Sequence, residues 1–247
     1  MPSGRLGNPA RVARGSTSRV YEETSMIPSL SLEERVRTSP RLKALALRTE
    51  PLWRTLLYAT IVPPKNALAL MRLWLRGCAD LHFGCGKVSD ARFVNIDALP
   101  FGHVDFVTRS PMLRGFRRGS AASLYACHVF EHFPHAQQSR ILARWHALLR
   151  PGGRLRLSVP VFDKLVRTYQ RASGDVKAIQ MDLMGAQTYP GNVHFAIFNR
   201  EHLTALLTRA GFVSIRNWHP SDEPDWPRDY SWVDEVSLNL EAETPTA

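Results

Sequence analysis

The stretch ADLHFGCG, from Ala79 to Gly86, decides the fold. Its first five residues favour a β-strand, and Gly84 and Gly86 follow that strand with one residue between them. Glycine has no side chain, so the backbone after the strand can turn sharply and approach a ligand closely. A G-x-G turn is weakly specific by itself, and its meaning depends on the segments around it.

Alternating strands and helices extend from this turn to the C-terminus. Six further strands are predicted, at Phe93–Ile96, Val104–Val107, Leu124–Val129, Leu155–Val159, Phe212–Arg216 and Glu235–Leu240. Helices are predicted at Pro134–Leu149, Phe162–Ala172, Asp175–Met184 and from Asn199 to Ala210. This alternation indicates an α/β protein with a Rossmann-like, doubly wound and mostly parallel sheet of seven strands. The last two strands, joined by an insertion at Ser221–Tyr230, predict an antiparallel edge.

The first 78 residues differ from the rest in charge. Residues 1–78 hold 13 Lys+Arg and 5 Asp+Glu, a net +8, whereas residues 79–247 hold 19 and 17, a net +2. A domain that grips nucleic acid usually carries its own basic face, so we expect no nucleic-acid partner. The alternatives for the basic segment are a solvated tail and an arm with weak contact to a membrane surface.

Three regions follow from composition and pattern. Residues 1–40, rich in Gly, Ser, Pro and Arg, are predicted to be a disordered basic segment. Residues 41–78 are predicted to be a helical extension, with helices at Pro40–Thr60 and Pro64–Gly77. Residues 79–247 are then the α/β domain. The apolar stretches are too short to span a membrane, and no secretory signal is recognisable.

The cysteines point to a reducing compartment. Cys78, Cys85 and Cys127 are scattered and odd in number, which argues against a disulfide framework. We therefore expect a cytoplasmic protein.

Two more strand ends carry polar groups. Asp97 follows the second strand directly, and its carboxylate is suited to accept both hydroxyls of a ribose. His128-Val129-Phe130-Glu131-His132 follows the fourth strand and spells H-x-x-E-H, the inverted zinc-protease motif. That motif needs one helix to bring both histidines to the metal, whereas a strand precedes it here and Pro134 follows it. We therefore predict no metal site.

A nicotinamide dehydrogenase is the first alternative for a glycine turn followed by an acid. Its fingerprint is G-x-G-x-x-G with an acid about 20 residues further on. Here Ser89 stands at the third glycine, and Asp97 follows Gly86 by only 11 residues. That spacing leaves room for little or no helix between the first two strands, so a dehydrogenase is disfavoured.

Five ordered motifs together resemble the class I S-adenosylmethionine-dependent methyltransferases, in particular a small subgroup with the pattern LHLGCG…VNID…HVLEH…LRPGG. The motifs are Leu81–Gly86, Val94–Asp97, His128–Phe133, Leu148–Gly153 and Ala210–Phe212. The resemblance covers about residues 79–218. It implies S-adenosylmethionine as the cofactor.

The resemblance also implies roles for single residues. Four of them would lie along the methionine part of the cofactor: Phe83, Gly84, Cys85 and Gly86. Asp97 would hold the ribose hydroxyls, and His128 and Glu131 would border the cofactor and the reacting centre. The sequence departs from the family at His82, Val88 and Arg109, where many members have an acid, a third glycine and an adenine-contacting Asp.

The acceptor implied by the subgroup is a hydroxyl of a sugar or a small molecule. A hydroxyl benefits from a base that removes its proton, and histidine changes charge near neutral pH. The candidates are His132, after the fourth strand, and His194, in the loop Tyr189–Phe195; Tyr189 and Asn199 are weaker candidates for acceptor contacts. An Asn/Asp-Pro-Pro-Tyr signature of base methylation is absent.

A second hypothesis belongs to another class of protein. The three departures are also typical of a catalytically degenerate relative that binds the cofactor or serves as a scaffold. Its basic N-terminal arm would then bind a partner or a membrane surface.

Overall fold

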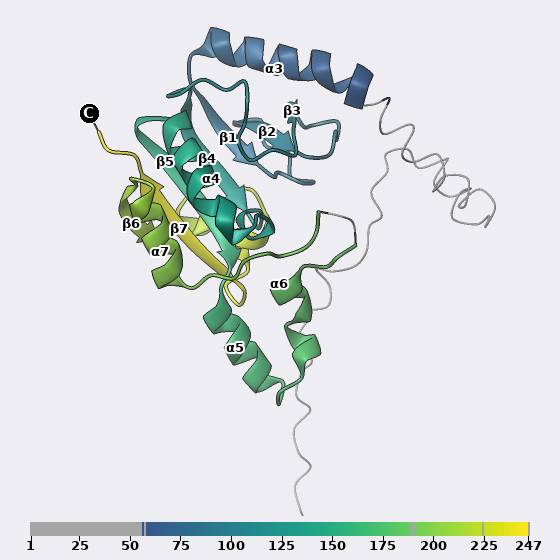
Figure 1. Cartoon of the computed structure of the whole chain (residues 1–247), viewed down its shortest axis with the longest axis vertical. Coiled ribbons are helices and arrows are strands. Elements are labelled where there is room, and N and C mark those ends of the chain that lie inside the picture. The colour runs from purple at the N-terminus through teal and green to yellow at the C-terminus, as the bar shows by residue number, and fades with distance from the viewer. Residues whose placement is uncertain (1–55, 57, 189–190, 224, 247) are drawn as a thin grey trace, which may run out of the picture. The chain divides into compact units, whose positions relative to one another are not determined.

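The computed structural model describes residue 56 and residues 58–188, 191–223 and 225–246 (Figure 1). They belong to a compact unit that spans Thr55–Ala247. The predictions for residues 1–40, and most of the predicted helix Pro40–Thr60, lie outside the described residues. No helix among the described residues has the length and apolar character needed to cross a membrane.

Seven strands form one sheet in the order β3-β2-β1-β4-β5-β7-β6. Their bounds are β1 Ala79–Phe83, β2 Phe93–Asp97, β3 Phe106–Val107, β4 Ala121–Cys127, β5 Leu149–Pro160, β6 Val213–Asn217 and β7 Ser237–Glu243. The first five strands pair in parallel, and β7 runs antiparallel to both of its neighbours, β5 and the outermost strand β6. The predicted seven-stranded, mostly parallel α/β sheet is confirmed.

Several element boundaries differ from the prediction. β3 begins at Phe106, two residues late, because Val104 donates its N–H to Phe101 O in a turn. β5 begins at Leu149, ahead of the Pro151–Gly153 turn, because Leu149 already pairs with Ala121 before a register shift. The predicted helix Asp175–Met184 is divided into a 3-10 turn, η3 (Val176–Ala178), and α6 (Gln180–Met184).

One face of the sheet holds the apolar core. Alternate strand residues such as Leu81, Leu124 and Leu155 are fully buried there, as the period of two in a strand requires. They pack against side chains of α3 (Val62–Arg76), α4 (His135–Leu148) and α7 (Arg200–Arg209). Asn199 caps α7 as predicted, accepting the His202 N–H at 2.8 Å. In Figure 1, α4 lies in front of the sheet, while α5 (Phe162–Arg171) and α6 extend away from it.

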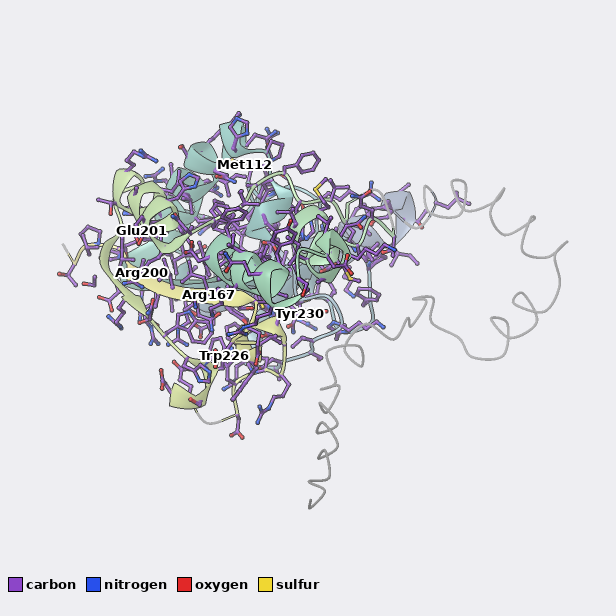
Figure 2. All side chains as sticks on the ribbon, turned by 90° about the horizontal axis from the view of Figure 1, so that it is seen from below. Met112, Arg167, Arg200, Glu201, Trp226 and Tyr230 are labelled. Atoms are coloured by element: carbon purple, nitrogen blue, oxygen red, sulfur yellow. The ribbon has the colours of Figure 1, made fainter. Side chains whose placement is uncertain are left out.

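The opposite face is polar and aromatic, and the segment 218–236 covers it. Tyr125 and Cys127 of β4 form a second cluster there with Trp226, and Trp218, Tyr230 and Trp232 pack around it. This segment contains the 3-10 turns η4 (Pro220–Asp222) and η5 (Tyr230–Trp232), which overlap the two ends of the predicted insertion. In Figure 2, Trp226 and Met112, which packs against the apolar core, lie on opposite sides of the domain.

Candidate functional site

The glycine turn after β1 is tied to the end of β2 by backbone hydrogen bonds. Gly84 N and Cys85 N both donate to Ile96 O, at 2.7 and 3.1 Å. Gly86 N donates to Asp97 Oδ2 at 2.8 Å. Because the two strands are parallel neighbours, the turn and the carboxylate meet at one edge of the sheet, where ligands bind in open α/β folds.

The two glycines of the turn have different surroundings. Both have a positive φ, 74° at Gly84 and 55° at Gly86. A Cβ at Gly84 would lie 2.2 Å from Cγ2 of Val129, so this glycine is required by the close approach of the segment after β4. A Cβ at Gly86 would meet nothing within 4 Å. The turn therefore has open space beside Gly86.

Asp97 is half-buried and already engaged on both oxygens. Oδ2 accepts the Gly86 N–H, and Oδ1 accepts the Leu99 N–H at 2.8 Å. Burial raises the pKa of this carboxyl, while the backbone hydrogen bonds oppose that shift. Each carboxylate oxygen has a second lone pair, so further hydroxyl donors can still be accepted.

The side chains of Phe83 and Cys85 point into the protein. Phe83 packs against Phe133 and Trp145 in the apolar core. Cys85 is buried in a small cluster with Val62 and Val104, and burial raises the pKa of its thiol far above the usual range. Only the backbone of these two residues is available to a ligand, which limits the roles that the family resemblance implies for them.

His128 directly follows β4 and has a left-handed backbone, φ 50°. Its Nε2 lies 2.8 Å from Ser237 Oγ, and that hydroxyl donates to Tyr230 O at 2.6 Å. The hydroxyl therefore accepts from Nε2–H, which leaves the lone pair of the neutral ring on Nδ1. Burial lowers the pKa of His128 to about 3, so the ring is neutral at physiological pH.

Glu131 is the most deeply buried acid of the site. It lies in η2 (Phe130–His132), with 0% of its surface exposed. Neither carboxylate oxygen has a hydrogen-bond partner among the described residues. Oε1 lies 3.6 Å from His128 Nδ1 and 3.9 Å from His194 Nε2. Burial raises the pKa of Glu131 to about 8.

The rings of His132 and His194 pack edge to face beside this carboxylate, with centroids 4.8 Å apart. His132 Nδ1 lies 3.0 Å from Val193 O, and His194 Nδ1 lies 2.9 Å from Asp182 O. Burial lowers the pKa of His194 to about 4; it also lowers the pKa of His132, against the carbonyls of Val193 and His128. Burial thus favours the neutral form of both rings, in which one nitrogen of each ring holds a lone pair.

The candidate residues from the sequence thus form two adjoining groups. One is the turn with Asp97, and the other is the cluster of Glu131, His132 and His194 with His128 beside it. They are adjacent because Gly84 contacts Val129, which lies between His128 and Glu131 in the chain. Tyr189 lies outside the described residues.

Some residues at the site carry no signal in the sequence. His103 reaches from the loop between β2 and β3 to place Nε2 2.9 Å from Gly86 O. Ser237, at the start of β7, contacts His128 across 109 positions of the chain. Both contacts depend on the assembled sheet, so neither could be found by motif or spacing.

A separate cleft of about 460 Å³ lies beyond the glycine turn, on the aromatic side. It is lined by Val88, Ser89 and Asp90 from the connection between β1 and β2, and by residues of the segment 218–236, Trp226 among them. None of the site residues predicted from the sequence lines this cleft.

No family model and no curated protein sequence matches the chain. Among solved structures, a possible exported protein from Bordetella parapertussis aligns with a TM-score of 0.46 and 16% identity, over 92% of this chain and 78% of that one. A 1,6-didemethyltoxoflavin N1-methyltransferase from Burkholderia thailandensis aligns at 0.43 and 18%, over 84% and 91%. A SAM-dependent methyltransferase from Archaeoglobus fulgidus aligns at 0.45 and 13%, over 72% and 94%. These values are too low to assign a function, and the fold follows from the strand order itself.

Proposed function

We propose that this protein is an S-adenosylmethionine-dependent methyltransferase that acts on a hydroxyl of a sugar or another small molecule. The observation that carries the proposal is the hydrogen bond from Gly86 N to Asp97 Oδ2, which joins the glycine turn and the acid at adjacent strand ends. The order of the sequence motifs supports it independently.

The residues at this edge fit a nucleoside cofactor. Open space beside Gly86 admits a ligand close to the backbone. Asp97 is partly exposed and retains lone pairs for the two hydroxyls of a ribose. The bound cofactor would supply a methyl group on a positively charged sulfur.

The cluster after β4 would serve the acceptor. In-line displacement depends mostly on holding the acceptor oxygen opposite the methyl group, which is a matter of positioning. The lone pairs on the rings of His132 and His194 are available to take the hydroxyl proton. A small-molecule acceptor, a cytoplasmic location and the lack of a nucleic-acid partner stay part of this proposal.

Isothermal titration with S-adenosylmethionine and S-adenosylhomocysteine tests the cofactor. We expect binding to the wild type, and a loss of at least about tenfold in Asp97→Ala, because each hydrogen bond to a charged group contributes about 1.5–3 kcal/mol. Asp90→Ala is the matched control. Asp90 is an acid in the connection between β1 and β2; it pairs with Arg92 and lines the separate cleft.

Each outcome has a distinct meaning. Loss of binding in Asp90→Ala alone would place the ligand in the cleft and contradict the assignment of Asp97. Absence of binding to the wild type would overturn the proposal. The catalytically silent scaffold, with its working residues in the basic N-terminal segment, would then be the favoured hypothesis.

A further inference from the structure

Three groups that normally accept hydrogen bonds or bind cations converge after β4. One ligand atom each from Glu131, His132 and His194 lies within 4.8 Å of the others. The carboxylate is fully buried, and neither of its oxygens has a hydrogen-bond partner among the described residues. A buried carboxylate without a partner is costly, so its persistence calls for a compensating positive charge or a proton.

Hydrogen bonds to backbone carbonyls fix the orientation of the His132 and His194 rings. A backbone carbonyl can only accept, so the Nδ1 atoms of His132 and His194 carry the hydrogens that point to Val193 O and Asp182 O. In a neutral imidazole the other nitrogen, Nε2, then holds a lone pair. Histidines that bind metals almost always donate their other N–H to a carbonyl or carboxylate in this way.

His194 lies close to the carboxylate. Its Nε2 lies 3.9 Å from Glu131 Oε1, beyond hydrogen-bond distance. When Glu131 is ionised, two acceptors therefore lie at a separation that a shared cation would bridge. His128 Nδ1 adjoins the same oxygen at 3.6 Å, although His128 is not one of the three mutually close groups.

We propose that Glu131, His132 and His194 bind one divalent transition-metal cation. Two imidazoles and a carboxylate suit Zn²⁺, Fe²⁺, Mn²⁺ or Co²⁺, whereas Mg²⁺ and Ca²⁺ prefer sites made of oxygen alone. Ligands bound at about 2.1 Å lie about 3.0–3.5 Å apart, so the three groups need only small side-chain rotations to close around the ion.

The histidine pair of this site differs from the pair in the H-x-x-E-H pattern. That pattern couples His128 with His132, and the strand before it argues against a metal. The structure instead brings His194 to Glu131 from a loop 62 residues beyond His132, which no local motif encodes. The hydrogen bond from Phe195 N to Glu131 O, 2.8 Å long, holds that loop against η2.

The metal site itself is inferred from the geometry of the three side chains. Only the role of the cation, acting on the acceptor hydroxyl, rests on the proposed function. Three protein ligands leave coordination positions open for a hydroxyl or water. A bound cation would lower the pKa of such a hydroxyl, so its proton would pass to water without a histidine base. His132 and His194 would then act as ligands, since their lone pairs are used.

Cobalt binding by the full chain, without a polyhistidine tag and without S-adenosylmethionine, tests the site. The protein is stripped with a chelator, dialysed against Co²⁺, and measured by elemental analysis and visible absorption. We expect one Co²⁺ per chain. We also expect a loss of affinity of at least about tenfold in each of Glu131→Gln, His132→Ala and His194→Ala, since even an outer partner of a ligand contributes that much.

His135→Ala is the matched control, because His135 is exposed and lies only three residues beyond His132. It should leave Co²⁺ binding unchanged. Circular dichroism identifies any variant that fails to fold. The ligand variants that do fold then show whether Glu131, His132 and His194 bind the Co²⁺. Wild type without stoichiometric Co²⁺, or binding that survives in every folded ligand variant, would overturn the site.

Asp97→Ala separates the two proposals. It should keep Co²⁺ and lose S-adenosylmethionine. Failure of the metal site with intact cofactor binding, or the reverse, therefore overturns one proposal and leaves the other standing.

Discussion

Gly84 and Gly86 show how two residues of one type, two positions apart, can serve different purposes. Their backbones share a positive φ, which costs an L-residue about 1–2 kcal/mol. Only Gly84 also lacks space for a side chain, because Val129 lies against it. Gly84 is therefore needed for packing, and Gly86 is free to serve a ligand.

Substitution of each glycine by alanine should separate these roles. We expect Gly84→Ala to lower the free energy of unfolding by about 2–4 kcal/mol, as strain in the backbone adds to overpacking. Gly86→Ala should cost about 1–2 kcal/mol and weaken cofactor binding more than stability. Urea unfolding measures the first effect and titration the second.

The Val129→Ala background provides the control for Gly84. Removing the valine methyl groups relieves most of the overpacking, since only Val129 Cβ remains, 3.2 Å from the added Cβ. It does not relieve the backbone strain, so Gly84→Ala should cost less there than in the wild type. Equal costs in both backgrounds would show that the contact with Val129 is unimportant.

His82 is a buried residue on the aromatic face of β1. Its ring packs against Tyr125 and Phe93, and burial lowers its pKa from 6.5 to about 4, against the opposing charges of Asp229 and Asp90. His82 thus places a neutral, buried ring at this position. Many members of the methyltransferase family that the sequence resembles have an acid there.

This burial makes stability depend on pH. The unfolded chain takes up a proton on His82 below about pH 6.5, and the folded chain does so only near pH 4, so stability is lost as the pH falls between these values. We expect the wild type to lose about 2 kcal/mol more than His82→Phe between pH 7 and pH 5. Urea unfolding at both pH values measures the difference.

The exposed His135 supplies the comparison for this prediction, as His135→Phe. It should keep the pH dependence of the wild type. If His82→Phe also keeps it, the acid sensitivity arises elsewhere.

At the scale of elements, the segment 218–236 covers the face of the sheet that helices leave open. Trp226 is central to it, with ring centroids 4.9 Å from Tyr125 and 5.1 Å from Trp218. The guanidinium of Arg156, which pairs with Glu241, lies 4.8 Å from the Trp226 ring. An irregular segment therefore shields a buried ion pair.

Truncation of Trp226 should be severe. Trp226 is 5% exposed, and we expect Trp226→Ala to cost about 3–5 kcal/mol through the cavity that it leaves. Trp74→Ala is the control; Trp74 is 60% exposed on α3, and its loss should cost less than about 1 kcal/mol. Circular dichroism in urea measures both without relying on tryptophan fluorescence. Similar costs for the two variants would contradict a packing role for Trp226.

The elements that the sequence predicts well are those with a regular period. Ala79–Phe83 is predicted with its observed bounds, and the Asn199 cap is confirmed, because alternation and capping are local properties. The early start of β5 is missed, since Leu149 pairs with Ala121 across the sheet before the Pro151–Gly153 turn. The role of the segment 218–236 is missed for the same reason: its tryptophans show no period and pack only on the assembled face.

At the scale of the whole molecule, one part of the candidate site can be predicted from the sequence, and the other part depends on the tertiary structure. The turn and Asp97 come together because parallel strands end at one edge, which the strand order alone implies. The approach of His194 to Glu131 depends on how the loop before α7 folds back over η2, and no pattern of residues specifies that. The carbonyls that orient the two histidines likewise belong to the tertiary structure.

The short connection between β1 and β2 bears on which ligands the proposed cofactor site could accept. The stretch from Gly86 to Phe93 is fully described and contains no helix. Phosphate sites in related folds use the free N–H groups and the roughly half positive charge of a helix N-terminus. Here the three N–H groups of the turn already donate to Ile96 O and Asp97 Oδ2, and no helix follows the turn to add its dipole. The edge thus lacks the groups that bind polyphosphates in such folds, which agrees with the proposed cofactor, a nucleoside that carries positive charge. Converting this protein to bind a dinucleotide would require inserting a helix, beyond any exchange of single side chains.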